Sequence, residues 1–328
     1  MMHRLQIAPM MGYTHRHYRY LMRRLCPDAL LYSEMITTGA LLFGDAHRYL
    51  AHDATEQPVA LQLGGNDPSA LAQCASMAVE NGYTQINLNV GCPSSRVKEG
   101  GIGASLYRSP QLVAECVTAM CAAVSVPVTV KCRIGVDDCD QFDYLVDFAN
   151  KVDLAGAAYL VVHARKAWLS GLNPKQNRTI PPLRYDVVRD LSGCVDIPIV
   201  LNGGLTDVDS IKQQLDVFPG VMVGRYACSH PLELSEFSRG GPPSALFIAD
   251  ILKDYFSYMS DRLQQGDRVS FMIQPLHGFF RASRGAKRWR SLLGAMQTGL
   301  LSGRGTPADY FEEILAHVQL SDRHSLLD

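Results

Sequence analysis

The stretch Gln85-Ile-Asn-Leu-Asn-Val-Gly-Cys-Pro-Ser94 sets the interpretation of the whole chain. Ile86, Leu88 and Val90 alternate with two asparagines, which predicts a short strand with both amides on one face. The strand must end at Gly91-Cys92-Pro93, because glycine allows unusual backbone angles and proline cannot donate to a strand ladder. A thiol and two amides therefore converge at the carboxyl end of a strand, which is where parallel α/β folds bind ligands.

Two interpretations of Cys92 are open at this point. Most free cysteines are small buried hydrophobes, and Cys92 would then only fill space. Its position between two turn residues at a strand end supports a functional thiol as strongly as its residue type supports a packing role. The rest of the chain must distinguish the two.

The composition describes a large globular protein. The chain has 328 residues, of which 47% are hydrophobic and 19% are charged. This is enough for one large domain and a smaller one. The net charge of −1 gives no general sign of a nucleic-acid partner, so the distribution of charge matters more than its sum. The nine cysteines contain no C-x-x-C pair, so we expect neither a disulfide framework nor a bound metal.

The sequence predicts a cytoplasmic protein without membrane contact. The first residues include His3, Arg4 and Gln6 and lack the apolar core of a signal peptide. Elsewhere no apolar run approaches the roughly 20 residues that span a bilayer.

Eight short apolar runs recur along the chain, each followed by a helical pattern. The predicted strands are residues 5–8, 30–33, 59–63, 86–90, 127–133, 159–163, 197–201 and 220–224. The clearest predicted helices are residues 68–81, 110–124 and 141–154, with another beginning near residue 207. Eight β-then-α units in about 230 residues match a (β/α)8 TIM barrel, an α/β fold.

A doubly wound open sheet is the competing architecture. Such a sheet usually carries a G-x-G-x-x-G turn after its first strand, and Pro9-Met-Met-Gly12 does not match that turn. The runs are also rich in Val, Ile and Leu, as expected for strands buried on both faces. We therefore expect the barrel.

The pattern changes after residue 239. Gly240-Gly-Pro-Pro243 indicates a linker, and helical periodicity follows at residues 245–264, 271–282, 287–300 and 310–318. We predict a TIM-barrel domain over residues 1–240 and a small all-helical domain over residues 241–328. Between residues 268 and 308 the chain has seven Lys or Arg and no Asp or Glu, which concentrates positive potential there.

Polar side chains at the carboxyl ends of barrel strands all face one mouth and are candidates for function. Lys131 is the most informative of them, because a charge inside an apolar strand is costly unless it is paired. The whole set of candidates is Gln62, Asn89, Cys92, Lys131, Arg133, His163 and Asn202, together with the apolar Met10 and Met11.

Two glycine turns indicate a phosphate site. Asn202-Gly203-Gly204 follows the seventh strand and Gly224-Arg225 follows the eighth, and the loops after these strands are the usual phosphate site of barrels. A phosphate-bearing cofactor without a nucleotide-binding fold suggests FMN. Lys131 would then tune the electron-rich end of the flavin ring.

A set of motifs resembles those of the tRNA dihydrouridine synthases, in the order typical of that family. They are Ala8-Pro-Met-Met-Gly12, Asn87-Leu-Asn-Val-Gly-Cys-Pro-Ser94 with Val97 and Gly100-Gly-Ile-Gly-Ala104, Val130-Lys-Cys-Arg133, His163-Ala-Arg165, Asn202-Gly-Gly204 and Val223-Gly-Arg225. The resemblance covers nearly the whole chain. Residues 163–183 further resemble the A-type subfamily, which acts on uridines 20 and 20a of tRNA.

The resemblance implies an FMN barrel with a helical C-terminal domain that binds tRNA, and it assigns roles to individual residues. The general acid falls on Cys92. The flavin contacts fall on Pro9, Met10, Met11, Gln62, Lys131, His163, Asn202, Gly203, Gly204, Gly224 and Arg225. The tRNA contacts fall on Lys175, Arg178, Lys287 and Arg290, with Asn89 near the target base.

The implied reaction converts uridine to 5,6-dihydrouridine. FMN, reduced by NADPH, delivers hydride to C6 of uracil, and the Cys92 thiol protonates C5. Cysteine side chains are mostly protonated at pH 7, so a cysteine can serve as this acid. The target base must be splayed out of the folded tRNA to reach a barrel mouth.

Two other functions compete with this one. The first is a small-molecule FMN oxidoreductase of the dihydroorotate dehydrogenase or old-yellow type, and the second is a catalytically silent RNA-binding protein. The basic segment between residues 268 and 308 disfavours the first. The intact Cys92, Lys131 and His163 disfavour the second. We expect a monomer that binds tRNA and not DNA.

Overall fold

The computed structural model describes residues 2–281 and 285–316 of the chain. The chain divides into two compact units. Unit 1 consists of residues 1–12 and 29–224, and unit 2 consists of residues 13–28 and 225–328.

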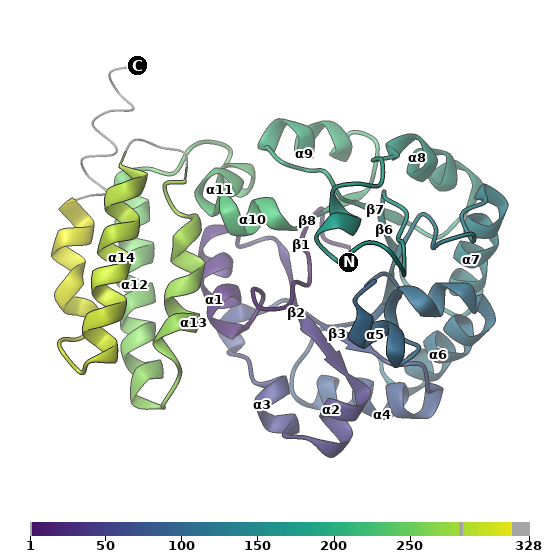
Figure 1. The fold of residues 1–328 in the computed structure, drawn as a ribbon, viewed down its shortest axis with the longest axis horizontal. Coiled ribbons are helices and arrows are strands. Elements are labelled where there is room, and N and C mark those ends of the chain that lie inside the picture. Colours follow the sequence, from purple (N-terminus) through teal and green to yellow (C-terminus); the bar gives the residue numbers. More distant parts are fainter. Residues whose placement is uncertain (1, 282–284, 317–328) are drawn as a thin grey trace. The chain divides into compact units, whose positions relative to one another are not determined.

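Unit 1 is a closed barrel of eight parallel strands, which confirms the predicted TIM barrel (Figure 1). Each strand pairs with the next one along the chain, and the last pairs with the first through Leu5 and Val221. The strands are β1 (Leu5–Ile7), β2 (Leu30–Thr37), β3 (Val59–Gly64), β4 (Gln85–Asn89), β5 (Val128–Arg133), β6 (Leu160–His163), β7 (Ile199–Asn202) and β8 (Gly220–Val223).

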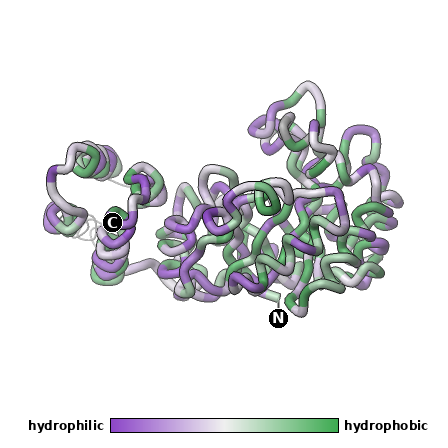
Figure 2. Tube along the Cα trace, turned by 90° about the horizontal axis from the view of Figure 1, so that it is seen from below, coloured by the Kyte–Doolittle hydropathy of each residue, from purple (hydrophilic) through white to green (hydrophobic). Residues whose placement is uncertain are grey.

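Helices connect the strands, and hydrophilic and hydrophobic residues are mixed along them (Figure 2). Asp67 caps α4 by accepting the backbone N–H of Ala70 at 2.6 Å, as its position before Pro68 predicts. The helices of unit 1 are α2 (Thr38–Phe43), α3 (Ala46–Leu50), α4 (Pro68–Glu80), α5 (Ser95–Glu99), α6 (Pro110–Ala123), α7 (Phe142–Leu154), α8 (Tyr185–Cys194) and α9 (Val208–Leu215), with 3-10 turns η1 (Ala54–Glu56), η2 (Gly103–Arg108) and η3 (Gln176–Arg178).

Strand β2 is longer than predicted. Its pairing with β3 shifts register between Tyr32 and Met35 and then continues to Thr37. The polar residues Ser33 and Glu34 interrupt the apolar run, so the sequence pattern indicated an end at residue 33. These polar residues do not end the strand. Ser33 Oγ accepts the backbone N–H of Gln62 at 3.0 Å and so links β2 to β3.

Side chains fill the amino-terminal half of the barrel. Gln85 Nε2 donates to the hydroxyls of Tyr32 and Tyr159, at 3.1 and 2.7 Å, and the Tyr32 hydroxyl donates to Gln6 Oε1 at 2.9 Å. The surrounding buried residues are Ala8, Leu30, Tyr32, Ala60, Tyr159, Val161, Val200 and Met222. With this end packed, the carboxyl ends of the strands are the place for a ligand.

Unit 2 is helical in its described part, as predicted for the C-terminal domain. Its helices are α1 (Arg16–Leu25), α10 (Arg225–Ser229), α11 (Pro231–Arg239), α12 (Ala245–Gln264), α13 (Val269–Ile273) and α14 (Ala286–Leu301), with 3-10 turns η4 (Gln274–Gly278) and η5 (Pro307–Tyr310).

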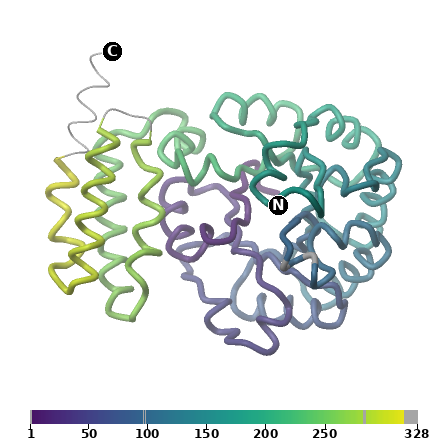
Figure 3. Tube along the Cα trace, viewed as in Figure 1, coloured from purple at the N-terminus to yellow at the C-terminus, as the bar shows by residue number. Residues whose placement is uncertain are grey.

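Helix α1 belongs to unit 2 although it follows the first barrel strand in sequence. The Tyr20 ring stacks on that of Tyr258 with centroids 3.9 Å apart, and Arg24 Nε lies 3.0 Å from Asp254 Oδ2. Unit 2 is therefore discontinuous along the chain (Figure 3). The structural units thus differ from the segments 1–240 and 241–328, and the functional division predicted for those segments stays a prediction.

Two predicted helices of unit 2 have different bounds. Residues 271–282 were expected to form one helix, but α13 ends at Ile273 and a 3-10 turn follows. Pro275 lacks a backbone N–H, and Gly278 packs so tightly that a Cβ would collide with the carbonyl of Cys228. Of the helix predicted at 310–318, residues 311–316 are helical, whereas 282, 317 and 318 lie outside the described residues.

Candidate active site

The barrel register brings the predicted strand-end residues side by side. Asn89 on β4 pairs with Lys131 on β5. Arg133 pairs with His163 on β6, and His163 pairs with Asn202 on β7. These side chains therefore form one mouth at the carboxyl ends of four consecutive strands, as the sequence predicts.

A chain of side-chain hydrogen bonds leads from the barrel interior to Cys92. Asn87 Nδ2 donates to Thr129 Oγ1 at 2.9 Å, and Gln62 Nε2 donates to Asn87 Oδ1 at 2.8 Å. Asn89 Nδ2 then donates to Gln62 Oε1 at 2.8 Å, and Asn89 Oδ1 accepts the backbone N–H of Cys92 at 3.0 Å. Because Gln62, Asn87 and Asn89 are all buried, the chain fixes the backbone at the thiol.

The Cys92 thiol is half-buried, and its Sγ lies 3.5 Å from Ser94 Oγ. Its surroundings differ from those of Cys26 and Cys132, which are fully buried. Burial raises the pKa of both of those thiols to about 12, so they stay protonated and inert. Partial exposure is compatible with a functional thiol, and Cys121, Cys139 and Cys228 share it.

Lys131 faces an amide, and no carboxylate among the described residues pairs with it. Its Nζ donates to Asn202 Oδ1 at 2.9 Å, and Asn202 Nδ2 donates to the Met222 carbonyl at 2.7 Å. Desolvation, and then the charge of Arg133, lowers the pKa of Lys131 to about 8. Removing an ammonium from water in this way leaves a site that favours an anionic ligand.

His163 is neutral at pH 7. Burial lowers its pKa well below the ordinary value, and the cations Arg133, Lys131, Arg165 and Arg178 lower it further. The ring packs directly on the turn after β7, since a Cβ at Gly203 would collide with it. His163 can therefore offer a hydrogen bond to a ligand without adding a charge.

The predicted phosphate turns leave backbone donors unused. Gly203 and Gly204 have φ values of +105° and +73°, and the Tyr185 hydroxyl holds the turn by donating to the Gly203 carbonyl at 2.6 Å. Within residues 2–281 and 285–316, no acceptor bonds the N–H groups of Gly203, Gly204 and Gly224. These three backbone donors fit a phosphate group.

The loop after β1 is held by a residue that the sequence did not single out. The Gly12 N–H donates to the Glu34 carboxylate, and Gly12 has a φ of +76°. Within this loop Pro9 and Met10 are half-buried, and Met11 is 65% exposed. A Cβ on Gly224 would lie 3.7 Å from Met10 Sδ, so the loop approaches the turn after β8.

Arg133 also has a role that the sequence pattern did not reveal. The side chain is 3% exposed, and burial lowers its pKa to about 10. Its Nε donates to the Gly91 carbonyl at 3.1 Å, and its Nη1 donates to the carbonyls of Asn177 and Lys166 at 2.9 and 3.3 Å. Arg133 therefore joins the Cys92 turn to the loop after β6.

The predicted tRNA-contacting cations lie in both units. Lys175 and Arg178 are exposed in unit 1, at the 3-10 turn η3 between β6 and α8. Lys287 and Arg290 are exposed on α14 in unit 2, as their spacing on one helical face predicts. Arg225 directly follows Gly224 as the exposed first residue of α10.

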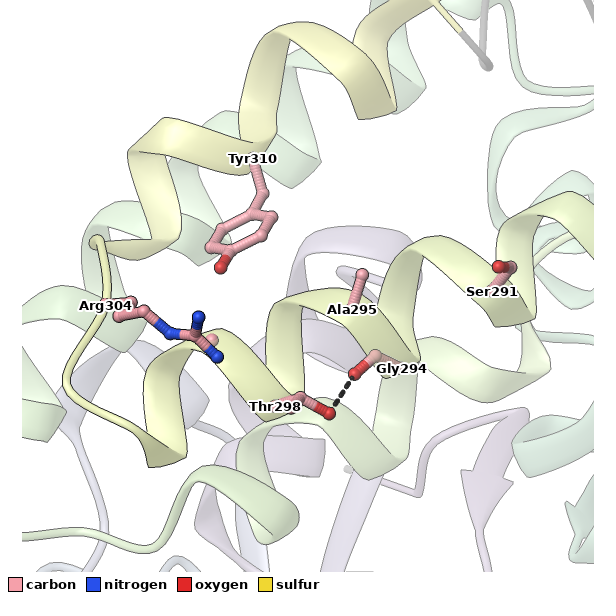
Figure 4. Close-up of a pocket in the computed structure, with 7 residues that line it drawn as sticks. Ser291, Gly294, Ala295, Thr298, Arg304 and Tyr310 are labelled. Atoms are coloured by element: carbon pink, nitrogen blue, oxygen red, sulfur yellow. Dashed lines mark hydrogen bonds between the residues drawn. The ribbon is translucent and has the colours of Figure 1, made fainter.

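A groove in unit 2 contains none of these residues (Figure 4). It lies between α14 and η5, has a volume of about 570 Å³ and is lined by Ser291, Gly294, Ala295, Thr298, Gly299, Arg304 and Tyr310. A Cβ at Gly299 would collide with the Tyr310 hydroxyl, so close helix packing explains the small residues here.

Two features of the described residues bear on other classes of protein. No described helix has both the length and the apolar character that a bilayer span requires. Within the same residues, no group of three or more His, Cys, Asp or Glu side chains is placed to hold a metal ion.

Known proteins resemble this chain over almost its full length. A family model described as dihydrouridine synthase matches residues 6–300. The tRNA-dihydrouridine(20/20a) synthases of Xanthomonas campestris pv. campestris and Pseudomonas putida are both 47% identical to the chain, over 302 and 296 residues. These alignments cover 90% and 89% of this chain and 90% and 88% of the relatives. The Escherichia coli K12 enzyme of the same name is 46% identical over 297 residues, or 88% of this chain and 85% of that enzyme.

Two solved structures share the fold at low identity. A 2-naphthoyl-CoA reductase in complex with 2-naphthoyl-CoA matches with a TM-score of 0.57 and 11% identity, over 73% of this chain and 50% of that one. A morphinone reductase variant in complex with tetrahydroNAD matches with a TM-score of 0.51 and 14% identity, over 74% and 89%. The barrel architecture is therefore shared with these reductases, whereas the family follows from the much closer relatives. This chain belongs to the dihydrouridine synthase family.

Proposed function

We propose that this protein is an FMN-dependent tRNA-dihydrouridine synthase that uses NADPH to reduce uridines 20 and 20a in the D-loop of tRNA. The observation that carries the proposal is the bond from Asn89 to the backbone of Cys92, which holds a half-buried thiol beside the cationic mouth of the barrel. The names of the 46–47% identical relatives support the positions in tRNA.

The residues at the mouth fit FMN. The unused N–H groups of Gly203, Gly204 and Gly224 suit its phosphate, and Lys131 and the neutral His163 suit an electron-rich ring. The Gln62 amide donates one hydrogen bond to Asn87 and accepts one from Asn89. This leaves one amide hydrogen and one oxygen lone pair of Gln62 for a ligand. The proposed contacts are Pro9, Met10, Met11, Gln62, Lys131, His163, Asn202, Gly203, Gly204, Gly224 and Arg225.

Bound FMN would supply the hydride that adds to C6 of uracil after reduction by NADPH. Cys92 is the residue that supplies the proton at C5. Asn89 positions Cys92 by accepting the Cys92 backbone N–H, and this sets where the thiol meets the base. Arg133 holds the same turn from the other side through the Gly91 carbonyl. The chain thus fixes its acid by two buried polar residues before the substrate arrives.

Exposed cations are the proposed tRNA contacts. Lys175 and Arg178 would bind phosphates from unit 1, and Lys287 and Arg290 would bind them from unit 2, while Asn89 lies near the base. We place this activity in the cytoplasm and assign it to a monomer.

Two measurements test the proposal. Heat denaturation of the purified protein should release a flavin with the mass of FMN, and FAD or no flavin after reconstitution would contradict the cofactor assignment. With NADPH and an unmodified tRNA transcript, mass mapping should then show a gain of two hydrogens at positions 20 and 20a. Reduction of free pyrimidines without reduction of tRNA would instead favour the small-molecule oxidoreductase.

A further inference from the structure

The two tryptophans of the chain have opposite surroundings. Trp289 in unit 2 is 1% exposed, and its indole N–H donates to the Leu276 carbonyl at 2.8 Å. Trp168 lies in the loop between β6 and α8 and is 39% exposed. In the part of the chain that the structure describes, nothing accepts the Trp168 indole N–H. Core packing therefore explains Trp289 but not Trp168.

The backbone around Trp168 is fixed from several sides. The buried Asn177 accepts the Trp168 N–H with its Oδ1 at 2.7 Å and donates to the Trp168 carbonyl with its Nδ2 at 2.9 Å. The neighbouring Ala167 N–H donates to the Gly135 carbonyl at 2.9 Å, and the Leu169 N–H donates to Asp137 Oδ1 at 2.9 Å. The loop therefore fixes the position of the half-exposed indole before a ligand binds. This lowers the entropic cost of binding a ligand to the ring.

One face of the indole carries a cation. Lys166 Nζ lies 4.1 Å from the centroid of the Trp168 ring, and the same ammonium lies 2.6 Å from Asp140 Oδ2. The ion pair with Asp140 keeps the lysine over the ring. The Lys166 ammonium therefore covers one face of the indole. A flat ligand would stack on the exposed part of the ring.

Arg133 ties this loop to the catalytic turn. One guanidinium binds both the Gly91 carbonyl, next to Cys92, and the Lys166 carbonyl, two residues before Trp168. The same guanidinium also binds the Asn177 carbonyl at 2.9 Å. The thiol turn and the Trp168 loop are therefore held by a shared buried side chain.

We propose that Trp168 is a stacking platform for a nucleobase of the RNA, adjacent to the uridine that meets Cys92. This rests on the proposed function, since it requires RNA at the barrel mouth. Nucleobases bind to exposed aromatic rings by stacking, and every base has a face for it, so such a platform holds RNA without reading its sequence. The exposed Lys175 and Arg178 belong to the same loop and suit the phosphates on either side of the stacked base.

Tryptophan fluorescence tests the contact directly, because the chain has only two tryptophans. The oxidised holoenzyme is titrated with an unmodified tRNA transcript in the absence of NADPH. The wild type should lose part of its emission as RNA binds. The variant Trp168→Phe, which reports on Trp289 alone, should bind the RNA without that loss.

Affinity gives the second readout. Trp168→Ala should weaken tRNA binding by about 5- to 150-fold, the range associated with loss of one stacked base, while Trp168→Phe should retain part of the affinity. Both variants should keep FMN and its reduction by NADPH. The control is Leu154→Ala, which removes an exposed apolar side chain at the carboxyl end of α7. It should change neither signal.

The outcomes separate this inference from the proposed function. If the wild type binds and reduces tRNA but Trp168→Ala has unchanged affinity and Trp168→Phe an unchanged loss of emission, the stacking platform is wrong and the activity stands. If the wild type neither binds nor reduces tRNA, both ideas are overturned. If adding FMN to the flavin-free protein causes all of the change in Trp168 emission and RNA causes none, Trp168 is a flavin contact and the platform is again wrong.

Discussion

Asn89 Oδ1 accepts the backbone N–H of Cys92 at 3.0 Å, and the same oxygen accepts the N–H of Gly91 at 3.1 Å. The amide of Asn89 is fixed in turn by its donation to Gln62 Oε1. A side chain inside the barrel therefore sets the backbone of the turn that carries the thiol. This relationship makes Asn89 a positioning residue for Cys92, in addition to its proposed place near the target base.

Asn89→Ala should slow uridine reduction by about a hundredfold, the cost of misplacing a reacting group by about 1 Å. It should also lower the free energy of unfolding by about 1–3 kcal/mol, because Gln62 Oε1 loses its donor. Single-turnover rates and urea unfolding measure the two effects. The control is Asn87→Ala, one layer deeper in the same chain of bonds. It should cost similar stability and much less rate, and equal rate losses would count against the bond to Cys92.

Cys92→Ala should reduce the rate of dihydrouridine formation by about a hundredfold or more, as expected on loss of a general acid. FMN binding and flavin reduction by NADPH should persist, because no predicted cofactor contact is removed. Cys26→Ala and Cys74→Ala serve as controls, since both thiols are fully buried. Their variants should stay active. A Cys92→Ala protein that modifies tRNA at the wild-type rate would show that this thiol is structural.

The affinity of the flavin-free protein for FMN should depend on pH through Lys131. Its pKa is lowered to about 8, so the ammonium is present below that pH and is lost as the pH rises through it. FMN binding should therefore weaken as the pH rises above about 8, because the ammonium of Lys131, which faces the electron-rich end of the flavin ring, loses its positive charge. Fluorescence titration of FMN across this range measures the effect.

Lys131→Met keeps much of the apolar stem and removes the ionisable group. This variant should bind FMN more weakly at pH 7, and its affinity should no longer fall above pH 8. A wild-type affinity that is independent of pH up to 9 would mean that the Lys131 charge does not contribute to binding.

Gly203→Ala should abolish FMN binding and lower the free energy of unfolding by about 1–3 kcal/mol. Gly203 has a φ of +105°, and a Cβ there would collide with the His163 ring. Gly193→Ala is the matched control, because Gly193 is helical and its Cβ would meet no atom within 4 Å. It should stabilise the protein by up to about 1 kcal/mol. Flavin content and thermal unfolding distinguish the two variants, and normal flavin content in Gly203→Ala would refute the phosphate turn.

Replacing Lys287 and Arg290 by Ala should weaken tRNA binding and flatten its salt dependence by about one to two log units per log unit of salt. Both side chains are exposed on α14, and phosphate contacts release counterions when they form. Titration of tRNA at several salt concentrations gives the slope. FMN reduction by NADPH should be unaffected.

The control for charge is the pair Arg189→Ala and Lys212→Ala, which removes two exposed cations from α8 and α9 of unit 1. This double variant has the same net charge as the Lys287 and Arg290 variant. It should keep the wild-type slope. Equal slopes in all three proteins would remove the RNA-binding role assigned to α14.

The sequence by itself determined the barrel and most of its mouth. Eight apolar runs that alternate with helices fit either a parallel barrel or a doubly wound sheet, and the missing G-x-G-x-x-G turn after the first run favours the barrel. The positions of Asn89, Cys92, Lys131, His163 and Asn202 could then be predicted, because every strand of a parallel barrel ends at the same mouth. The exposed faces of Lys287 and Arg290 followed from helical periodicity alone.

Tertiary structure alone decided the contacts between residues that are distant in sequence. Nothing local indicates that α1 packs with helices that follow β8, since Tyr20 meets Tyr258 only in the folded chain. The bond of Glu34 to Gly12 and the three carbonyls bound by Arg133 likewise depend on how loops from different strands approach one another. A charged side chain in a strand shows that a partner is needed, but its sequence does not say which backbone carbonyl provides it. That choice is made only when the barrel closes and brings the ends of β4, β5 and β6 together.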